Sequence, residues 1–95
     1  MSGIDMHRRR LIYRGHVQGV GFRYTSQQIA RAYAVSGFVR NLSDGTVELC
    51  LSGSSSEVGR YLAAIAERLA ANIEHVDDLA LAPDIVLPAG FEIRR

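Results

Sequence analysis

The chain has 95 residues, 47% of them hydrophobic, which is enough to bury one compact core and too little for two independent domains. Eleven Lys and Arg against ten Asp and Glu give a net charge of +1, so no global field favours nucleic acid or an anionic membrane. A single cysteine, Cys50, excludes an internal disulfide and does not suit a zinc site.

No apolar stretch approaches the roughly 20 residues that cross a bilayer, and the first residues lack the pattern of a signal peptide. We therefore expect a cytoplasmic protein without metal, nucleic-acid or membrane partners, and a monomer by default. Residues 1–6 predict a short flexible end, and residues 7–95 predict a single domain.

The first predicted element is a strand over residues 9–14. Three glycines in the next seven residues let the backbone curve tightly, so residues 15–21 predict a loop. From Phe22 the apolar and small residues follow a helical period, with one face formed by Phe22, Ser26, Ile29, Ala30 and Tyr33. Gly37 is expected to end this helix or to follow its end.

Two strands, over residues 38–42 and 46–51, flank the Asp44-Gly45 pair, which is typical of a tight hairpin turn. The second strand alternates, so its apolar face lies opposite Cys50, which we interpret as a packing or partly exposed thiol. Ser54 and Glu57 form a capping box before a second helix with its own apolar stripe. A return strand through residues 73–81, a loop over 83–90 and a closing strand over 91–94 complete the chain.

The predicted order is therefore βαββαβ with a short terminal strand. Two helices with one apolar stripe each would cover one face of an antiparallel sheet, which is the ferredoxin-like α+β sandwich. In this order the strand that carries Asn41 can neighbour the strand that leads into the glycine-rich loop. Metal carriers, RNA-binding modules and enzymes all share this architecture. The function must therefore be inferred from the residues of the site and not from the fold.

The glycine-rich loop runs from a strand into a helix, where backbone N–H groups and the helix dipole favour a bound anion. Glycines that merely serve a sharp turn are the alternative. Arg23 stands in the first turn of the helix, where the dipole opposes a cation unless an anion is bound nearby. Its planar, always charged guanidinium can bind two phosphate oxygens, although a solvated surface arginine is equally compatible with its position.

Asn41 ends a strand beside the predicted turn. An asparagine there commonly bonds the local backbone, but its amide can also donate to and accept from a water molecule. The segments Gly15 to Arg23 and Gly37 to Glu48 together resemble the two signature segments of the acylphosphatase family, in the same order and at a suitable separation. The closing residues 91–94 are similar too, so the resemblance covers about residues 10–94.

This resemblance implies an enzyme that hydrolyses the mixed anhydride of small acyl phosphates to carboxylate and inorganic phosphate without a metal or other cofactor. It implies that Arg23 binds the phosphoryl group and that Asn41 positions the attacking water. The backbone amides that would surround the phosphoryl group are those of Val17, Gln18, Gly19, Val20, Gly21 and Phe22.

Two non-catalytic readings compete with the enzyme. An RNA-binding ferredoxin-like module would need exposed aromatic side chains on its inner strands, which offer mainly Phe38. A regulatory domain would bind phosphate or carbamoyl phosphate without releasing product.

Overall fold

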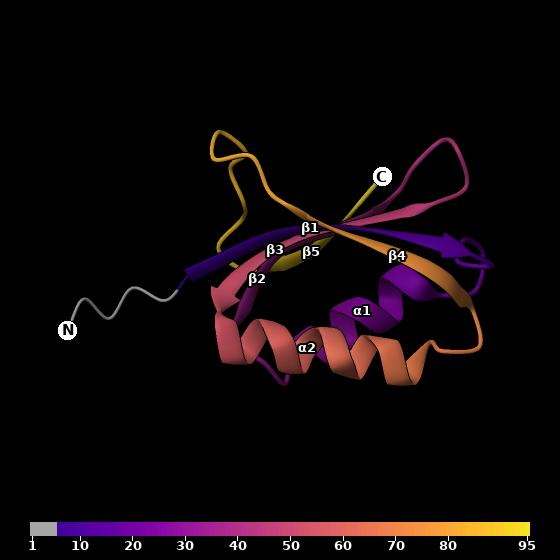
Figure 1. Cartoon of the computed structure of the whole chain (residues 1–95), viewed down its shortest axis with the longest axis horizontal. Coiled ribbons are helices and arrows are strands. Elements are labelled where there is room, and N and C mark those ends of the chain that lie inside the picture. The colour runs from indigo at the N-terminus through magenta and orange to yellow at the C-terminus, as the bar shows by residue number, and fades with distance from the viewer. Residues whose placement is uncertain (1–5) are drawn as a thin grey trace.

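The computed structural model describes residues 6–95, and Figure 1 shows its seven elements in the predicted order. They are β1 (Met6–Gly15), α1 (Phe22–Ala30), β2 (Val35–Asn41), β3 (Val47–Ser54), α2 (Ser55–Arg68), β4 (Ile73–Ala80) and β5 (Phe91–Arg94). Residues 1–5 of the predicted flexible end lie outside the described part, and Met6 already belongs to β1. No helix within residues 6–95 is long and apolar enough to span a bilayer.

The five strands form one sheet in the order β4-β1-β3-β2-β5, and both helices lie on the same face of it (Figure 1). The predicted ferredoxin-like α+β sandwich is therefore confirmed. The sheet is mixed rather than wholly antiparallel, because β5 returns after a long loop and pairs parallel with β2, from Gly37↔Phe91 to Arg40↔Arg94.

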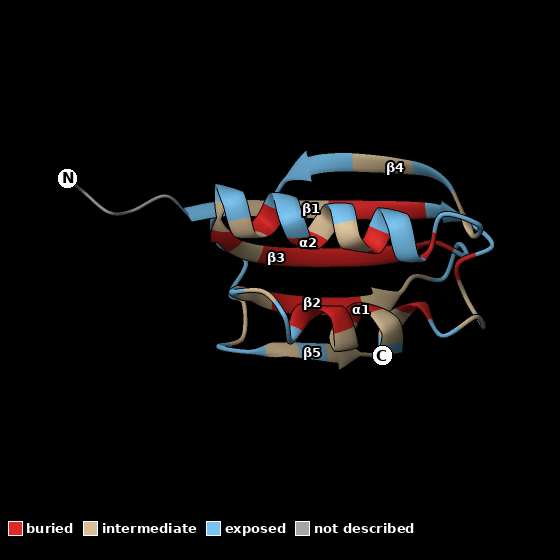
Figure 2. Ribbon diagram, turned by 90° about the horizontal axis from the view of Figure 1, so that it is seen from below, coloured by how far each residue is buried: buried red, intermediate tan, exposed pale blue. Residues whose placement is uncertain are grey.

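The predicted neighbourhood of the Asn41 strand and the strand before the loop is wrong, because β3 lies between β1 and β2. The apolar pattern of β3 explains its central place. Val47, Leu49 and Leu51 are fully buried under the helices, and Figure 2 shows burial along most of the strand. A strand with both faces covered is best placed where it has a hydrogen-bonded neighbour on each side.

The main core lies between the helices and the sheet. Its members include Phe22 and Ile29 from α1 and Tyr61 and Ile65 from α2. The Ser54 hydroxyl accepts a hydrogen bond from Glu57 N at 3.2 Å, which is the N-cap half of the predicted capping box. The Glu57 carboxylate accepts from Ala34 N at 2.7 Å, so it ties the start of α2 to the segment that follows α1.

The first helix is shorter than predicted and the second strand begins earlier. Bonds from Ala32 N to Ile29 O and from Tyr33 N to Ala30 O tighten the last turn of α1, so Tyr33 follows the helix while still packing on the core. Gly37 is not a helix terminator but a residue within β2. A Cβ there would lie 2.0 Å from the Cys50 carbonyl oxygen, so the close approach of β2 to β3 requires glycine.

The Gly37→Ala variant should lose about 3 kcal/mol of unfolding free energy, because the added methyl group can fit only if β2 moves away from β3. Urea unfolding followed by circular dichroism measures this loss. Gly59→Ala is the matched control, since a Cβ at this exposed α2 position meets nothing within 4 Å. The control should gain roughly 0.5–1 kcal/mol from helix propensity. Equal stability of the two variants would contradict the close approach at Gly37.

The outer face of the sheet, away from the helices, carries a second small core. Phe38, Cys50 and Leu81 are buried there, and Leu87 packs against them from the loop over residues 81–90. Cys50 therefore is a packing thiol, and burial raises its pKa to about 11, which leaves it protonated near neutral pH. Phe38 is buried as well, so it does not offer the exposed aromatic surface that an RNA-binding module would use.

Glu48 also lies on the outer face of the sheet, and it is only 3% exposed although it carries a charge. Its two carboxylate oxygens accept hydrogen bonds from Arg10 Nε at 2.6 Å and Arg40 Nε at 2.5 Å. Burial by itself would raise the pKa of Glu48, but the bonds and charges of the two arginines outweigh it, and the pKa is lowered from its ordinary value of 4.5. The carboxylate is ionised at neutral pH.

Stability should therefore depend on pH through Glu48. Because the pKa is lower in the folded than in the unfolded chain, the stabilisation is complete above the unfolded value and is lost as pH falls through the folded one. At pH 7 Glu48→Gln should cost about 2 kcal/mol, less than a fully buried pair because both arginines are partly exposed. The gap between wild type and variant in urea unfolding should narrow as pH falls below 4.5, the ordinary pKa of a glutamate, toward the lower pKa of the folded state. A constant gap would contradict the ion-pair account.

Candidate functional site

The loop between β1 and α1 has the curvature that the glycine pattern predicts. Gly19 and Gly21 adopt φ values of 77° and 80° in the left-handed region. A Cβ at either position would meet nothing within 4 Å, so the backbone conformation and not crowding requires glycine. We call the curved segment over residues 17–22 the bend. Val17 and Phe22 are buried at its two ends and fix it on the core.

The bend leads directly into the N-terminus of α1. The first helical hydrogen bond runs from Thr25 N to Gly21 O at 2.9 Å, so the amides of Phe22, Arg23 and Tyr24 precede the helical ladder. Gly21 at the N-cap has no side chain to accept from them, and the first turn contains no acidic residue. These donors and the positive end of the helix dipole suit an anion.

Gln18 fastens the loop to the β2–β3 hairpin. Its side-chain Nε2 donates to Leu42 O at 2.7 Å and to Thr46 O at 2.8 Å. The hairpin turn itself is ordered by Asp44, whose carboxylate accepts from the amide and the hydroxyl of Thr46 at 3.1 and 2.6 Å. Those two bonds lower the pKa of Asp44. The loop thus reaches the hairpin across the end of β3, although β1 and β2 are not neighbours.

Asn41 is the last residue of β2, next to this hairpin turn. Val39, two residues earlier, is fully buried in the core under the helices. Because side chains alternate along a strand, the Asn41 carboxamide is on the helix face of the sheet, the same face as α1 and the bend. The predicted role of Asn41 requires this placement.

Arg23 is half-buried in the first turn of α1, and its Nη1 donates to Arg94 O at 3.4 Å. In the parallel pairing of β2 and β5, Arg94 lies opposite Arg40, which immediately precedes Asn41. The guanidinium therefore reaches the end of the β2–β5 pair at the level of Asn41. The bend with the start of α1, the end of β2 and the end of β5 are far apart in the sequence, and they meet at one corner of the molecule.

Sequence reasoning missed the tether from Gln18, because a glutamine in a loop gives no sign of the carbonyl groups that it bonds. It also missed the contact between Arg23 and Arg94, since neither residue type specifies the other. Within residues 6–95, no three His, Cys, Asp or Glu side chains converge as a metal site would require. Fold and site thus define a small α+β sandwich with a backbone loop suited to a phosphoryl group.

Comparisons with known proteins agree with this class. The family model described as acylphosphatase matches residues 9–93. An acylphosphatase of Burkholderia mallei is 46% identical over 67 residues, which cover 66% of this chain and 68% of the relative. An acylphosphatase of Listeria welshimeri is 44% identical over 64 residues, covering 65% and 69% respectively. The crystal structure of acylphosphatase from Bacillus subtilis superposes with a TM-score of 0.79 and 25% identity, covering 95% of this chain and 99% of that one. This chain belongs to the acylphosphatase family.

Proposed function

We propose that this member of the acylphosphatase family hydrolyses small acyl phosphates with Arg23, the amides of residues 17–22 and Asn41 as its working groups. The observation that carries the proposal is the convergence at one corner. The Gln18 bonds hold the bend against the hairpin, and Arg23 bonds to the carbonyl group of Arg94, which lies opposite Arg40, the residue before Asn41.

The phosphoryl group would lie over the bend, where the amides and the helix dipole face its oxygens. Arg23 adds a full positive charge and a planar fork that fits two of these oxygens. In the loose transition state of phosphoryl transfer, charge spreads over the equatorial oxygens, so fixed positive groups lower the barrier without reorganising. The bound anion also removes the conflict between Arg23 and the helix dipole.

Asn41 orients the attacking water. The water oxygen bonds to phosphorus while the bond from phosphorus to the acyl oxygen breaks, and the electron pair leaves with the carboxylate. A carboxylate is a good leaving group, so no general acid is needed. Because an amide cannot act as a base, the proton of the water passes to a phosphate oxygen, and the products are carboxylate and inorganic phosphate.

The direct test is hydrolysis of benzoyl phosphate by the purified chain in the presence of EDTA. We expect the same rate with and without the chelator, because every positive group of the proposed site belongs to the protein. Under the same conditions p-nitrophenyl phosphate and ATP should be hydrolysed at least about a hundred times more slowly, since their leaving groups depart less readily without an acid or a metal.

Loss of activity in EDTA would refute the metal-free mechanism. Equilibrium binding of inorganic phosphate without turnover of any acyl phosphate would favour the regulatory alternative. We further propose that the protein acts as a monomer in the cytoplasm. Light scattering of the purified chain tests the first of these points, and cell fractionation tests the second.

A further inference from the structure

A cavity of about 340 Å³ opens on the outer face of the sheet, away from the helices. Its floor is apolar and is formed by the buried side chains of Phe38, Cys50 and Leu81. Ala82 and Ile85, from the loop over residues 81–90, form one wall. A cavity of this volume is at the lower end of the range for small-molecule sites.

The polar side of the cavity is an ion cluster of Arg10, Arg40 and Glu48. Each guanidinium uses its Nε to bond one oxygen of the buried carboxylate. Within residues 6–95 these are the only hydrogen bonds of the two arginine side chains, so their Nη groups are still available as donors. Two positive charges against one negative charge leave a net charge of +1 beside an apolar floor. An anion in the cavity would meet this net charge and the Nη donors of two partly exposed guanidiniums.

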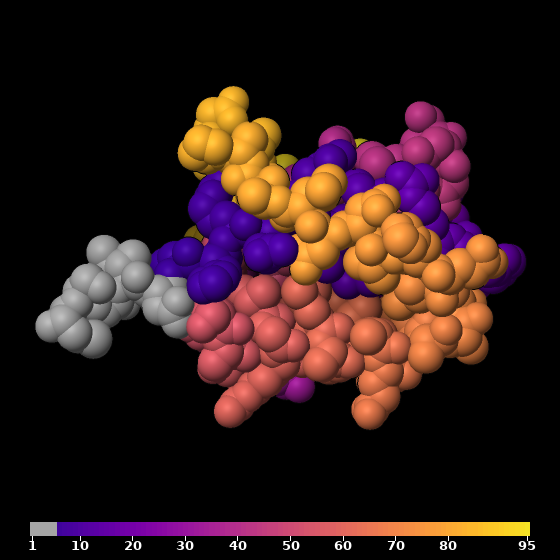
Figure 3. All heavy atoms as spheres, in the orientation of Figure 1, coloured from indigo at the N-terminus to yellow at the C-terminus, as the bar shows by residue number. Residues whose placement is uncertain are grey.

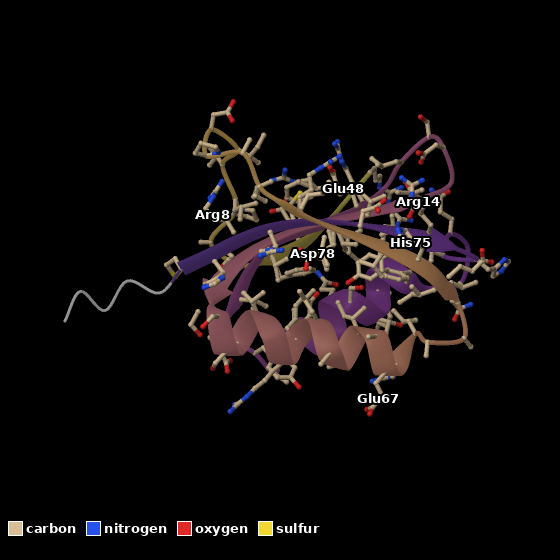
Figure 4. All side chains as sticks on the ribbon, viewed as in Figure 1. Arg8, Arg14, Glu48, Glu67, His75 and Asp78 are labelled. Atoms are coloured by element: carbon tan, nitrogen blue, oxygen red, sulfur yellow. The ribbon has the colours of Figure 1, made fainter. Side chains whose placement is uncertain are left out.

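The surroundings make this arrangement rigid and partly apolar. Arg94 lies over the Phe38 ring at 4.1 Å from its centroid and adds positive potential at the rim, although its Nε bonds Glu92. Arg8 Nη2 donates to Ala82 O at 3.0 Å and also to Ile85 O, so the wall is held in place. Figure 4 shows Arg8 beside this loop and Glu48 on the side of the sheet away from α2.

The loop that forms this wall also exposes apolar surface. Val86, at the tip of the same loop, is 83% exposed, and Ile85 is partly exposed. The space-filling view shows this loop and the β2–β3 hairpin rising on the same side of the molecule, opposite α2 (Figure 3). A ligand in the cavity would therefore meet guanidinium groups at one side and aliphatic side chains at the other.

We propose that this cavity binds an organic monocarboxylate with a small apolar body. A carboxylate matches the planar donors of Arg10 and Arg40, and its single charge balances the net charge of the cluster, whereas a phosphate dianion would exceed it. The body packs on Phe38, Cys50 and Leu81. The site is distinct from the catalytic corner, because Asn41 faces the other side of the sheet. Its ligand belongs to the same chemical class as the acid released from an acyl phosphate.

The test is titration of 3-phenylpropionate into the full chain, followed by backbone amide NMR, with saturating inorganic phosphate present to occupy the bend. The amides of Phe38, Cys50, Leu81, Ala82 and Ile85 should shift. The neutral analogue 3-phenylpropionamide should bind at least about tenfold more weakly, because it lacks the charge that the arginines recognise. Shifts confined to residues 17–23, or equal binding of the neutral amide, would overturn the proposal.

Ala82→Phe should fill the cavity without touching the ion cluster and weaken 3-phenylpropionate at least about tenfold, since the added ring takes the place of the ligand's apolar body. Ala66→Phe, on the exposed side of α2, is the matched control and should retain wild-type affinity. Arg40→Gln should also weaken binding about tenfold through loss of a charged donor, and Ala82→Phe still decides the case if that variant is unstable. Both Ala82→Phe and Ala66→Phe should hydrolyse benzoyl phosphate at the wild-type rate. Wild-type affinity in Ala82→Phe would contradict the assigned site.

Discussion

Arg23→Ala should lower kcat/KM for benzoyl phosphate by about 10³-fold, because it removes the one full positive charge that the proposed site directs at the transferring phosphoryl group. The same substitution should not lower the free energy of unfolding. The bond from Nη1 to Arg94 O is long, at 3.4 Å, and contributes little. Removal of a cation from the N-terminal turn of α1 relieves its conflict with the helix dipole, which is worth roughly 0.3–1 kcal/mol.

Stopped-flow hydrolysis and urea unfolding of the same preparation test both halves of this expectation. Arg31→Ala is the matched control, since Arg31 caps the other end of α1 and is exposed. It should retain full activity. An Arg23→Ala protein that is folded and hydrolyses acyl phosphate at a rate near that of wild type would show that the guanidinium is not part of the catalytic site. Arg23→Lys should recover only part of the loss, because an ammonium group keeps the charge but not the fork.

The opposite trends that we expect in activity and stability have the same cause as the signal that singled out Arg23 in the sequence. A cation at a helix N-terminus conflicts with local electrostatics, and such a conflict is typical of a functional position. The glycine positions of the bend could be predicted for a similar reason, since left-handed backbone conformations restrict the residue type. The order of helices and strands followed from apolar periods, which depend on short stretches of sequence.

Contacts between distant segments could not be predicted in this way. The central place of β3 depends on how much apolar surface each strand buries in the finished sheet, and it reverses the expected neighbourhood of the Asn41 strand. Glu48 occupies a polar position of an alternating strand, yet Arg10 and Arg40 arrive from two other strands and enclose it. Gly37 has the sequence context of a helix end, but the backbone of β3 is what demands it.

These long-range contacts determine the site more than its local sequence does. Asn41 lies two strands away from β1, and the bonds from Gln18 link the bend to the hairpin that follows Asn41. The proposed catalytic corner therefore includes a side-chain tether across the end of β3. The geometry of Arg23 and Asn41 is set by different elements, so each residue can be tested without disturbing the other.

Asn41→Ala should lower kcat for benzoyl phosphate by about a hundredfold with little change in KM, because the substitution releases the attacking water and leaves the phosphoryl contacts in place. Steady-state kinetics across substrate concentrations separates the two parameters. Ser43→Ala, at an exposed position in the same hairpin turn, is the control and should behave as wild type. A change confined to KM would mean that Asn41 holds the substrate and not the water.

Asn41→Asp refines this test, because the carboxylate is nearly the same size and still accepts a hydrogen bond from water. It cannot donate one, and it places a negative charge on the helix face of the sheet where the phosphoryl dianion binds. We therefore expect kcat to fall as in Asn41→Ala and KM to rise as well, through repulsion of the substrate. An Asn41→Asp enzyme with a normal KM would place the phosphoryl group well away from the end of β2. The proposal that the bend, Arg23 and Asn41 form one site would then be wrong.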